Sequence, residues 1–163
     1  MLDIAELQRR VSYDPLTGVL RWKADPPRGS VVGGILPTRD NGNGYIYATF
    51  GDRGYGVHRL GWAISFGQLP DEVDHRNTIK SDNRLANLRA ATRSQNEMNS
   101  PLKRSNSSGF KGVGWHKDRE RWRAYIQKDG RQCSLGYYDT AAEAHAAYAQ
   151  AAERLFGEFA RAA

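Results

Sequence analysis

The pattern of hydrophobic and polar positions in the first seventy residues predicts short helices and strands joined by turns. Apolar residues at helical spacing predict helices over residues 3–11 and 58–66. Alternating apolar and polar residues predict strands over 45–50 and 55–57, next to glycine-containing turns. This part of the chain is therefore expected to be rich in β-structure, and Gly67 is expected to end the second helix in a left-handed conformation.

Further along, the pattern predicts a strand, a loop, a second strand and a helix in immediate succession. The first strand covers residues 73–75, the loop 76–86 and the return strand 87–91. Thr92 and Gln95 then have the spacing of a capping box, which predicts the start of a helix. Elements in this order can converge on one point, so we expect side chains from both strands and the helix to meet.

The pattern changes in the last third of the chain. Short strands are predicted over residues 111–115, 121–128 and 131–137, and an Asp-Gly pair at 129–130 is a strong signal for a two-residue hairpin. A helix with an alanine-rich apolar stripe is predicted over 140–156. We expect these strands to form one antiparallel sheet whose apolar face packs against the helix.

Together these elements predict an α+β fold with two domains. Residues 1–100 would form the first domain, β-rich at its N-terminal end and with a strand–strand–helix core over about 70–100. The polar segment 101–108, rich in serine and asparagine, is predicted to be a linker. Residues 109–163 would form the second domain, a small three-stranded antiparallel sheet packed on one helix.

Charge and cysteine content narrow the possible partners. The net charge of +6 and the pI near 9.6 favour a polyanionic partner. Residues 103–131 hold nine basic and three acidic side chains, so much of the excess lies in one patch. Cys133 is the only cysteine, which excludes an intramolecular disulfide and fits a reducing bacterial or phage-infected cytoplasm; we expect it to be buried. No apolar stretch approaches the roughly twenty residues that span a bilayer, so no membrane partner is expected.

Polar side chains in the strand–loop–strand–helix segment form a candidate catalytic site. Asp74 and His75 end the first strand, Asn87 begins the second and Asn96 lies on the first turns of the helix. Carboxylate and amide oxygens are ligands for a hard divalent cation, and an imidazole can take a proton from water near neutral pH. Asn87 is expected to bridge the loop by side-chain-to-backbone hydrogen bonds. This combination predicts a metal site that hydrolyses phosphodiesters, with Asn99 as an alternative ligand to Asn96.

The order of these motifs resembles the ββα-metal core of HNH endonucleases, the His-Me finger fold, and especially the homing branch of phages and mobile elements. Residues 57–60 (Val-His-Arg-Leu) precede the Asp-His pair, as in homing-type members. Residues 83–88 fit the Asn-x-x-x-Asn-Leu pattern of the family, and residues 92–96 fit its Thr-x-x-x-Asn pattern. The order and spacing of all three motifs carry the resemblance.

This resemblance implies a site-specific, metal-dependent DNA endonuclease with a His-Asn-Asn variant of the motif. His75 would be the general base, Asn87 would organise the loop, and Asp74 and Asn96 would hold one Mg²⁺ or Mn²⁺ ion. The enzyme would cleave double-stranded DNA as a monomer or homodimer and leave 5′-phosphate and 3′-hydroxyl ends. His58 would be a metal neighbour, a phosphate contact or a packed histidine. The alternative is a catalytically inactive DNA-binding regulator.

The second domain resembles the DNA-binding domain of plant ethylene-response factors (APETALA type), which also occurs fused to HNH nucleases. The resemblance rests on the framework motifs at 112–113, 135–136, 138–140 and 147–148. It implies that the outward face of the sheet binds DNA in the major groove, whereas the base-reading positions differ from those of the plant domains. The predicted DNA-binding residues, from both domains, are Arg59, Arg93, Arg119, Arg121, Arg123, Tyr125, Gln127, Arg131, Gln132 and Ser134.

Overall fold

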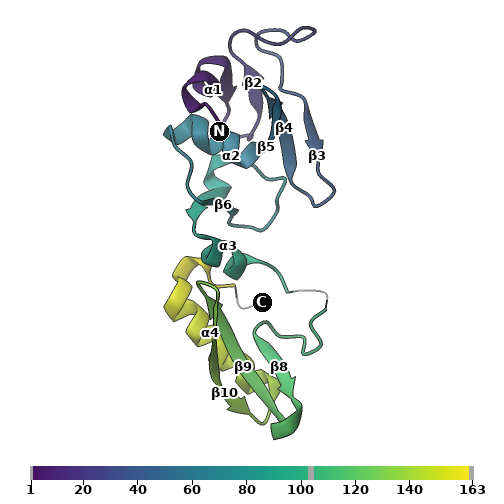
Figure 1. The fold of residues 1–163 in the computed structure, drawn as a ribbon, viewed down its shortest axis with the longest axis vertical. Coiled ribbons are helices and arrows are strands. Elements are labelled where there is room, and N and C mark those ends of the chain that lie inside the picture. Colours follow the sequence, from purple (N-terminus) through teal and green to yellow (C-terminus); the bar gives the residue numbers. More distant parts are fainter. Residues whose placement is uncertain (1, 103–104, 162–163) are drawn as a thin grey trace. The chain divides into compact units, whose positions relative to one another are not determined.

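The computed structural model describes residues 2–102 and 105–161, and the chain divides into two compact units, Met1–Ala91 and Thr92–Ala163 (Figure 1). The architecture is α+β, with small antiparallel sheets and short helices, as predicted. Of the expected linker, residues 103 and 104 lie outside the described residues. Within the described ranges, no helix has the length and hydropathy needed to cross a bilayer.

The first unit contains one α-helix at its N-terminal end and one in its middle, with β-strands between and after them. Along the chain its elements are α1 (Ile4–Arg10), β1 (Val11–Tyr13), β2 (Leu20–Trp22), β3 (Thr38–Asp40), β4 (Ile46–Phe50), β5 (Arg53–Gly56), α2 (Val57–Phe66), β6 (Glu72–His75), the 3₁₀ helix η1 (Leu85–Asn87) and β7 (Leu88–Ala91). The strands pair as β1 with β2, as β3-β4-β5, and as β6 with β7, and all pairs are antiparallel.

Helices α1 and α2 pack with β1, β2 and β4 around one apolar core. Asp3 caps α1 by accepting a hydrogen bond from Glu6 N, and Gly67 ends α2 in the left-handed conformation expected of it, with φ +68°. The core consists of Leu7, Val11, Leu20, Trp22, Leu36, Ala48, Phe50, Val57, Leu60 and Ala63. Strand β6, which follows α2 along the chain, contacts this helix.

The second unit consists of a short helix, a three-stranded sheet and a longer helix. Its elements are α3 (Arg93–Asn99), β8 (Val113–His116), the 3₁₀ helix η2 (Lys117–Arg119), β9 (Arg121–Lys128), β10 (Arg131–Tyr138), α4 (Ala141–Phe156) and the 3₁₀ helix η3 (Gly157–Phe159). The sheet order is β10-β9-β8, and α4 packs on one face through a core that includes Val113, Ala124 and Ala144 (Figure 1). Asp129 and Gly130 both have positive φ angles, as a tight hairpin between β9 and β10 requires.

Helix α3 lies in the second unit, whereas the sequence predicts it as the last element of the first domain. The Tyr148 hydroxyl donates a hydrogen bond of 3.2 Å to Met98 Sδ, and Asp129 N donates one of 3.1 Å to Ser94 Oγ. These contacts attach α3 to α4 and to the β9–β10 turn. Along the chain, the boundary between the two units falls between Ala91 and Thr92, before the segment that is predicted to be the linker.

Cys133 is exposed, so the prediction that it is buried is wrong. It lies opposite Ile126 in the register of β10 and β9. However, β10 is an edge strand, and its first half, Arg131–Ser134, is exposed at every position. Alternation along a strand predicts burial only where another element covers the inward face, and that cover does not reach this end of β10.

Candidate catalytic and DNA-binding site

The antiparallel pair β6 and β7 carries two of the residues proposed for catalysis. Asp74 lies opposite Arg89 in the register, and His75 lies opposite Leu88. Asp74 and Arg89 are both buried, and Arg89 Nε donates a hydrogen bond of 2.8 Å to Asp74 Oδ2. Facing residues on one side of an antiparallel pair are close enough for such a contact. The guanidinium therefore fixes the orientation of the Asp74 carboxylate.

The His75 imidazole is buried and is oriented by an amide from the loop. His75 Nε2 lies 3.1 Å from Asn83 Oδ1, and Asn83 Nδ2 donates to the Ser81 carbonyl at 3.2 Å. Because the amide nitrogen donates to a carbonyl, the amide oxygen must face the imidazole, and Nε2 must carry the proton. The basic lone pair of a neutral His75 is therefore on Nδ1.

Burial lowers the pKa of His75 below its usual value, because a charged imidazolium is poorly solvated in this environment. The hydrogen bond with Asn83 and the charge of Asp74 act in the opposite direction and are the smaller effects. The imidazole is therefore held in its neutral form. Only this form can accept a proton from an attacking water.

Asn87 joins the two ends of the loop between β6 and β7. Its Nδ2 donates to the Asp82 carbonyl at 2.7 Å, and its Oδ1 accepts from Asn77 N at 3.0 Å. In addition, Arg76 N donates to the Asn87 carbonyl at 2.8 Å. The side-chain-to-backbone hydrogen bonds expected of Asn87 are thus present, and they fix the course of the loop that contains Asn83.

The turn between β1 and β2 supports the backbone of Asn83. The Tyr13 hydroxyl donates a hydrogen bond of 2.6 Å to the Asn83 carbonyl. Gly18 in this turn has φ +75°, and a Cβ there would lie 2.6 Å from the Asn83 carbonyl carbon. Only glycine allows such a close approach. The N-terminal strands thus help to place the amide that orients His75.

Aromatic and imidazole rings surround His75. The His58 ring centroid lies 5.0 Å from that of His75, and the Tyr45 centroid lies 5.4 Å from His58 and 6.0 Å from His75. Lys80 Nζ lies 4.5 Å from the Tyr45 centroid. Burial lowers the pKa of His58 to about 3, so this ring is also neutral. Its burial and ring contacts favour the packed-histidine interpretation over a direct role.

Asn96, predicted as a metal ligand, lies on α3 in the second unit. Its side chain is half-buried, whereas that of the alternative ligand Asn99 is buried. The structure brings Asp74, His75 and Asn87 together within the first unit. The participation of Asn96 in the same site is part of the functional proposal below.

The proposed ligands have the chemistry that a hard divalent cation prefers. Asp74 supplies a carboxylate and Asn96 an amide oxygen, and Mg²⁺ is commonly bound by one or two carboxylates together with substrate phosphates and water. Among residues 2–102 and 105–161, no group of three or more His, Cys, Asp or Glu side chains is placed to hold a metal. The carboxylate and the amide both offer oxygen donors, so their chemistry fits a hard divalent cation.

The outward face of the β8–β10 sheet carries most of the predicted DNA-binding residues. Arg123, Tyr125 and Gln127 alternate along β9, with Tyr125 opposite Ser134 and Gln127 opposite Gln132. Arg123 Nε donates to Ser134 Oγ at 3.4 Å, and the Arg123 guanidinium carbon lies 5.8 Å from the Tyr125 ring centroid. These contacts hold the guanidinium over the sheet surface. The polar side chains around it are exposed or half-buried.

The remaining arginines predicted to bind DNA here are exposed on the sheet and on the 3₁₀ helix η2. Arg121 forms an ion pair of 3.1 Å with Asp139, and the Arg119 guanidinium carbon lies 4.6 Å from the Tyr137 ring centroid. Arg131 is exposed at the start of β10. Exposed ion pairs are weak, so Arg121 can exchange its partner for a phosphate at small cost.

The two DNA-binding residues predicted before the sheet and its adjoining 3₁₀ helix have contacts within the protein. Arg59 on α2 donates to the Asp71 carbonyl at 3.2 Å. Arg93 at the start of α3 is highly exposed and donates to Glu97 Oε1 at 3.1 Å, one helical turn away. Both contacts are compatible with a later exchange for phosphate oxygens, but neither points to DNA by itself.

Asn83 and Arg89 are functional candidates that the sequence reasoning did not assign. Asn83 is the first asparagine of the Asn-x-x-x-Asn-Leu pattern, and the pattern by itself indicates no function for it. Arg89 has no motif of its own, and its contact with Asp74 becomes apparent only from the strand register. In both cases the signal is a three-dimensional contact across a loop or a strand pair.

Comparisons with known proteins give family matches in both parts of the chain. The model of an HNH endonuclease family matches residues 55–98, and the model of the AP2 domain matches residues 108–158. Protein 3.8 of Escherichia phage T7 is 33% identical over 102 residues, which cover 61% of this chain and 84% of the phage protein. An uncharacterised HNH endonuclease of Acanthamoeba polyphaga mimivirus is 36% identical over 107 residues, or 64% of this chain and 54% of that protein.

A likeness is also found to a solved structure described as DNA binding and cleavage by the HNH homing endonuclease I-HmuI. The TM-score is 0.45 at 21% identity, over 94% of this chain and 82% of that chain. The family assignment rests on the sequence matches and not on this likeness. The chain belongs to the HNH endonuclease family, and it is a nuclease with an AP2 domain in its C-terminal third.

Proposed function

We propose that the chain is a site-specific, divalent-metal-dependent endonuclease of double-stranded DNA. The observation that supports this most strongly is the buried pair of His75 Nε2 and Asn83 Oδ1, 3.1 Å apart, on the strand that also carries the buried carboxylate of Asp74. A buried neutral imidazole of fixed tautomer next to an oxygen ligand is suited to the hydrolysis of a phosphodiester.

In the proposed reaction, His75 Nδ1 takes a proton from the water that attacks the scissile phosphorus in line. Asn83 holds the proton on Nε2 and fixes the ring plane, and Asn87 fixes the loop that carries Asn83. Asp74 and Asn96 hold the cation. When bound, the cation supplies stabilisation of the charge that develops on the phosphate and on the leaving 3′ oxygen. The products carry 5′-phosphate and 3′-hydroxyl ends.

The C-terminal sheet is proposed to provide affinity and target choice. Its outward face combines arginines with glutamine, serine and tyrosine, which bond to phosphates and base edges in the major groove. One catalytic site cuts one strand. A double-strand break therefore needs a homodimer or two successive nicks by a monomer.

Removal of divalent ions is the first test of this function. With Mg²⁺ or Mn²⁺, the protein is expected to convert supercoiled plasmid that contains its target to nicked or linear DNA, and EDTA is expected to stop this conversion. The ends should be joined by a DNA ligase without prior phosphorylation, since ligases need a 5′-phosphate and a 3′-hydroxyl group. Cleavage that continues in EDTA would contradict the metal-dependent mechanism.

The same assay separates the enzyme from a catalytically inactive DNA-binding regulator. A regulator would bind the target DNA with or without Mg²⁺ and leave plasmid supercoiled under every condition. The intact pairs of His75 with Asn83 and of Asp74 with Arg89 favour the enzyme. Binding without any nicking at saturating protein and metal would support the regulator instead.

Substitution of Arg123 by alanine is expected to weaken DNA binding by about tenfold and to reduce the salt dependence by about one unit of the log–log slope. The guanidinium lies over the outward face of the central strand, so its loss removes one contact to DNA. Filter binding or fluorescence anisotropy at several salt concentrations measures both values. Arg154→Ala is the matched control, because Arg154 is exposed on α4, which covers the other face of the sheet; equal effects of the two variants would contradict the proposed surface.

A further inference from the structure

Helix α3, which carries the proposed metal ligand Asn96, is too short to be stable alone. It has seven residues, whereas isolated helices shorter than about 12–15 residues are marginal in water. Its first turn is secured by a capping box, in which Gln95 N donates to Thr92 Oγ1 at 3.3 Å and Thr92 N donates to Gln95 Oε1 at 2.8 Å. The rest of its stabilisation must come from packing and from donors to its last carbonyl groups.

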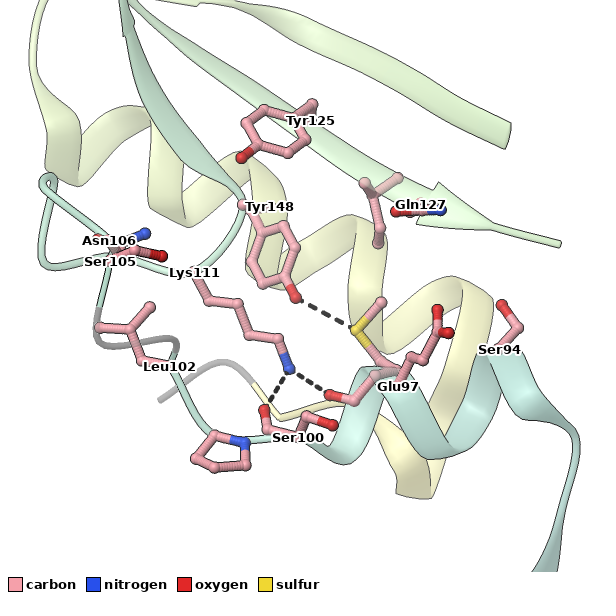
Figure 2. Close-up of a pocket in the computed structure, with 14 residues that line it drawn as sticks. Ser94, Glu97, Ser100, Leu102, Ser105, Asn106, Lys111, Tyr125, Gln127 and Tyr148 are labelled. Carbon is pink, nitrogen blue, oxygen red and sulfur yellow. Dashed lines mark hydrogen bonds between the residues drawn. The ribbon is translucent and has the colours of Figure 1, made fainter. Parts of the chain in front are cut away.

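Lys111, which lies between α3 and β8 in the chain, provides these donors (Figure 2). Its half-buried ammonium group donates to the Met98 carbonyl and, at 2.7 Å, to the Ser100 carbonyl. A positive charge at the C-terminal end of a helix is favourable, because the unpaired carbonyls there carry partial negative charge. Burial lowers the pKa of Lys111 to about 8, which still leaves the group mainly protonated at neutral pH.

One face of α3 is attached to the C-terminal unit. Ser94 accepts a hydrogen bond from Asp129 N in the β9–β10 turn, and Met98, one turn later, accepts from the Tyr148 hydroxyl of α4. Tyr148 passes close to Gly112, where a Cβ would lie 2.1 Å from the Tyr148 ring. The absence of a side chain at position 112 thus allows the ring to reach α3, as Figure 2 shows for Tyr148 and Lys111 together.

Asn96 lies on another face of the same helix. With 3.6 residues per turn, positions two residues apart differ by about 200° around the axis, so Asn96 points away from the face that contains Ser94 and Met98. The β9–β10 turn and α4 therefore contact one face of α3, and Asn96 lies on the opposite face.

A groove of about 610 Å³ runs between α3 and β9 within this unit. It is lined by Glu97 and Lys111 on one side and by Tyr125 and Gln127 on the sheet (Figure 2). Tyr125 and Gln127 are among the residues proposed to contact DNA. The proposed DNA-binding surface therefore lies next to the groove in which Lys111 contacts α3.

We infer that the sheet and α4 of the second unit stabilise α3, and that Lys111 is a positioning residue that holds this helix so that Asn96 can bind the cation. This inference rests on the proposed function for the role of Asn96. It means that the C-terminal unit supports catalysis in addition to binding DNA.

The test compares Lys111→Met with Lys111→Arg and with the control Lys117→Met in the full chain. Lys117 is exposed on η2, so its replacement makes the same chemical change away from α3. Hydrogen exchange followed by mass spectrometry measures the protection of the amides of Arg93–Asn99. Calorimetric titration with Mn²⁺ in the presence of target DNA measures metal affinity without relying on cleavage.

Lys111→Met is expected to speed exchange in α3 and to weaken Mn²⁺ binding by about 10- to 100-fold, the usual effect of losing a group that orients a ligand. DNA affinity should remain close to that of the parent protein. Lys111→Arg should restore most of the metal affinity, because a guanidinium can donate to both carbonyls, and Lys117→Met should change neither measurement. Parental exchange and Mn²⁺ affinity in Lys111→Met would overturn the inference, as would equal losses in Lys117→Met.

If Lys111→Met does not fold, Tyr148→Phe decides the question. This variant keeps the ring beside Gly112 and removes only the hydroxyl that donates to Met98. A smaller change in the same direction in exchange and Mn²⁺ affinity supports the inference, and no change in either overturns it. Failure of the proposed function would be visible separately, as cleavage by a His75→Ala variant, whereas the exchange measurement reports on α3 whether or not the protein cuts DNA.

Discussion

Replacing His75 with alanine is expected to lower DNA cleavage by about 100- to 10,000-fold, the usual contribution of a general base. The imidazole is buried beside Asp74, and Asn83 fixes its tautomer so that Nδ1 is the basic atom. Alanine has no group that can accept a proton at this place. Single-turnover cleavage of target plasmid at saturating protein and Mg²⁺ measures the loss.

DNA binding by His75→Ala should stay close to the parental level, because the proposed binding surface is the sheet of the other unit. The control is His116→Ala, which removes a half-buried histidine from the second unit and should cut at the parental rate. Parental cleavage by His75→Ala would show that the base assignment is wrong. Loss of both binding and cleavage would instead indicate a folding defect, which circular dichroism would detect.

Replacing Asp74 with asparagine is expected to lower cleavage by about 100- to 1,000-fold and to raise the Mg²⁺ concentration needed for half-maximal rate. Asparagine keeps an oxygen that can accept from Arg89, but it loses the negative charge that attracts the cation. Alanine is a poorer choice, since breaking a buried ion pair from one side costs about 3–5 kcal/mol in folding free energy. Cleavage rates over a series of Mg²⁺ concentrations separate weaker metal binding from a lower maximal rate.

Asp71→Asn is the matched control for this variant. Asp71 is exposed just before β6, so its replacement removes the same charge a short distance from the site. Its Mg²⁺ dependence should match that of the parent protein. If Asp74→Asn and Asp71→Asn behave alike, a general electrostatic effect would explain the data and Asp74 would not be a ligand.

The order of the elements and the fold class could be predicted from the sequence, because local patterns determine them. The capping box at Thr92 and Gln95 begins α3 as expected, Gly67 ends α2, and the Asp-Gly pair at 129–130 forms the hairpin. These features depend on interactions within a few residues. Strand β3 (Thr38–Asp40) was not predicted, because all of its residues are exposed and it has no apolar alternation.

The contacts that build the site could be predicted only in part, since they join segments far apart in the sequence. The bridging hydrogen bonds of Asn87 could be expected from its residue type and its place beside a loop. The contact of Arg89 with Asp74 depends on strand register, and the support of Asn83 by Tyr13 joins residues seventy positions apart. No local pattern carries that information.

The contacts that attach α3 to the second unit could also not be predicted from the sequence. The helix falls within the match to the HNH endonuclease family and before the match to the AP2 domain. A boundary drawn from family patterns and polar composition therefore places it in the first domain. Its partners Lys111, Asp129 and Tyr148 are spread over the C-terminal unit, and only the folded structure brings them to the helix.

The most direct test of the central claim is to locate the metal in a crystal of the His75→Ala protein bound to its target DNA and Mn²⁺. The anomalous signal of manganese identifies the ion and gives its position directly. We expect one peak within direct coordination distance of a carboxylate oxygen of Asp74, of the amide oxygen of Asn96 and of an oxygen of the phosphate to be cut. A manganese position that lacks either side chain, or no manganese beside the phosphate, would contradict the proposed site.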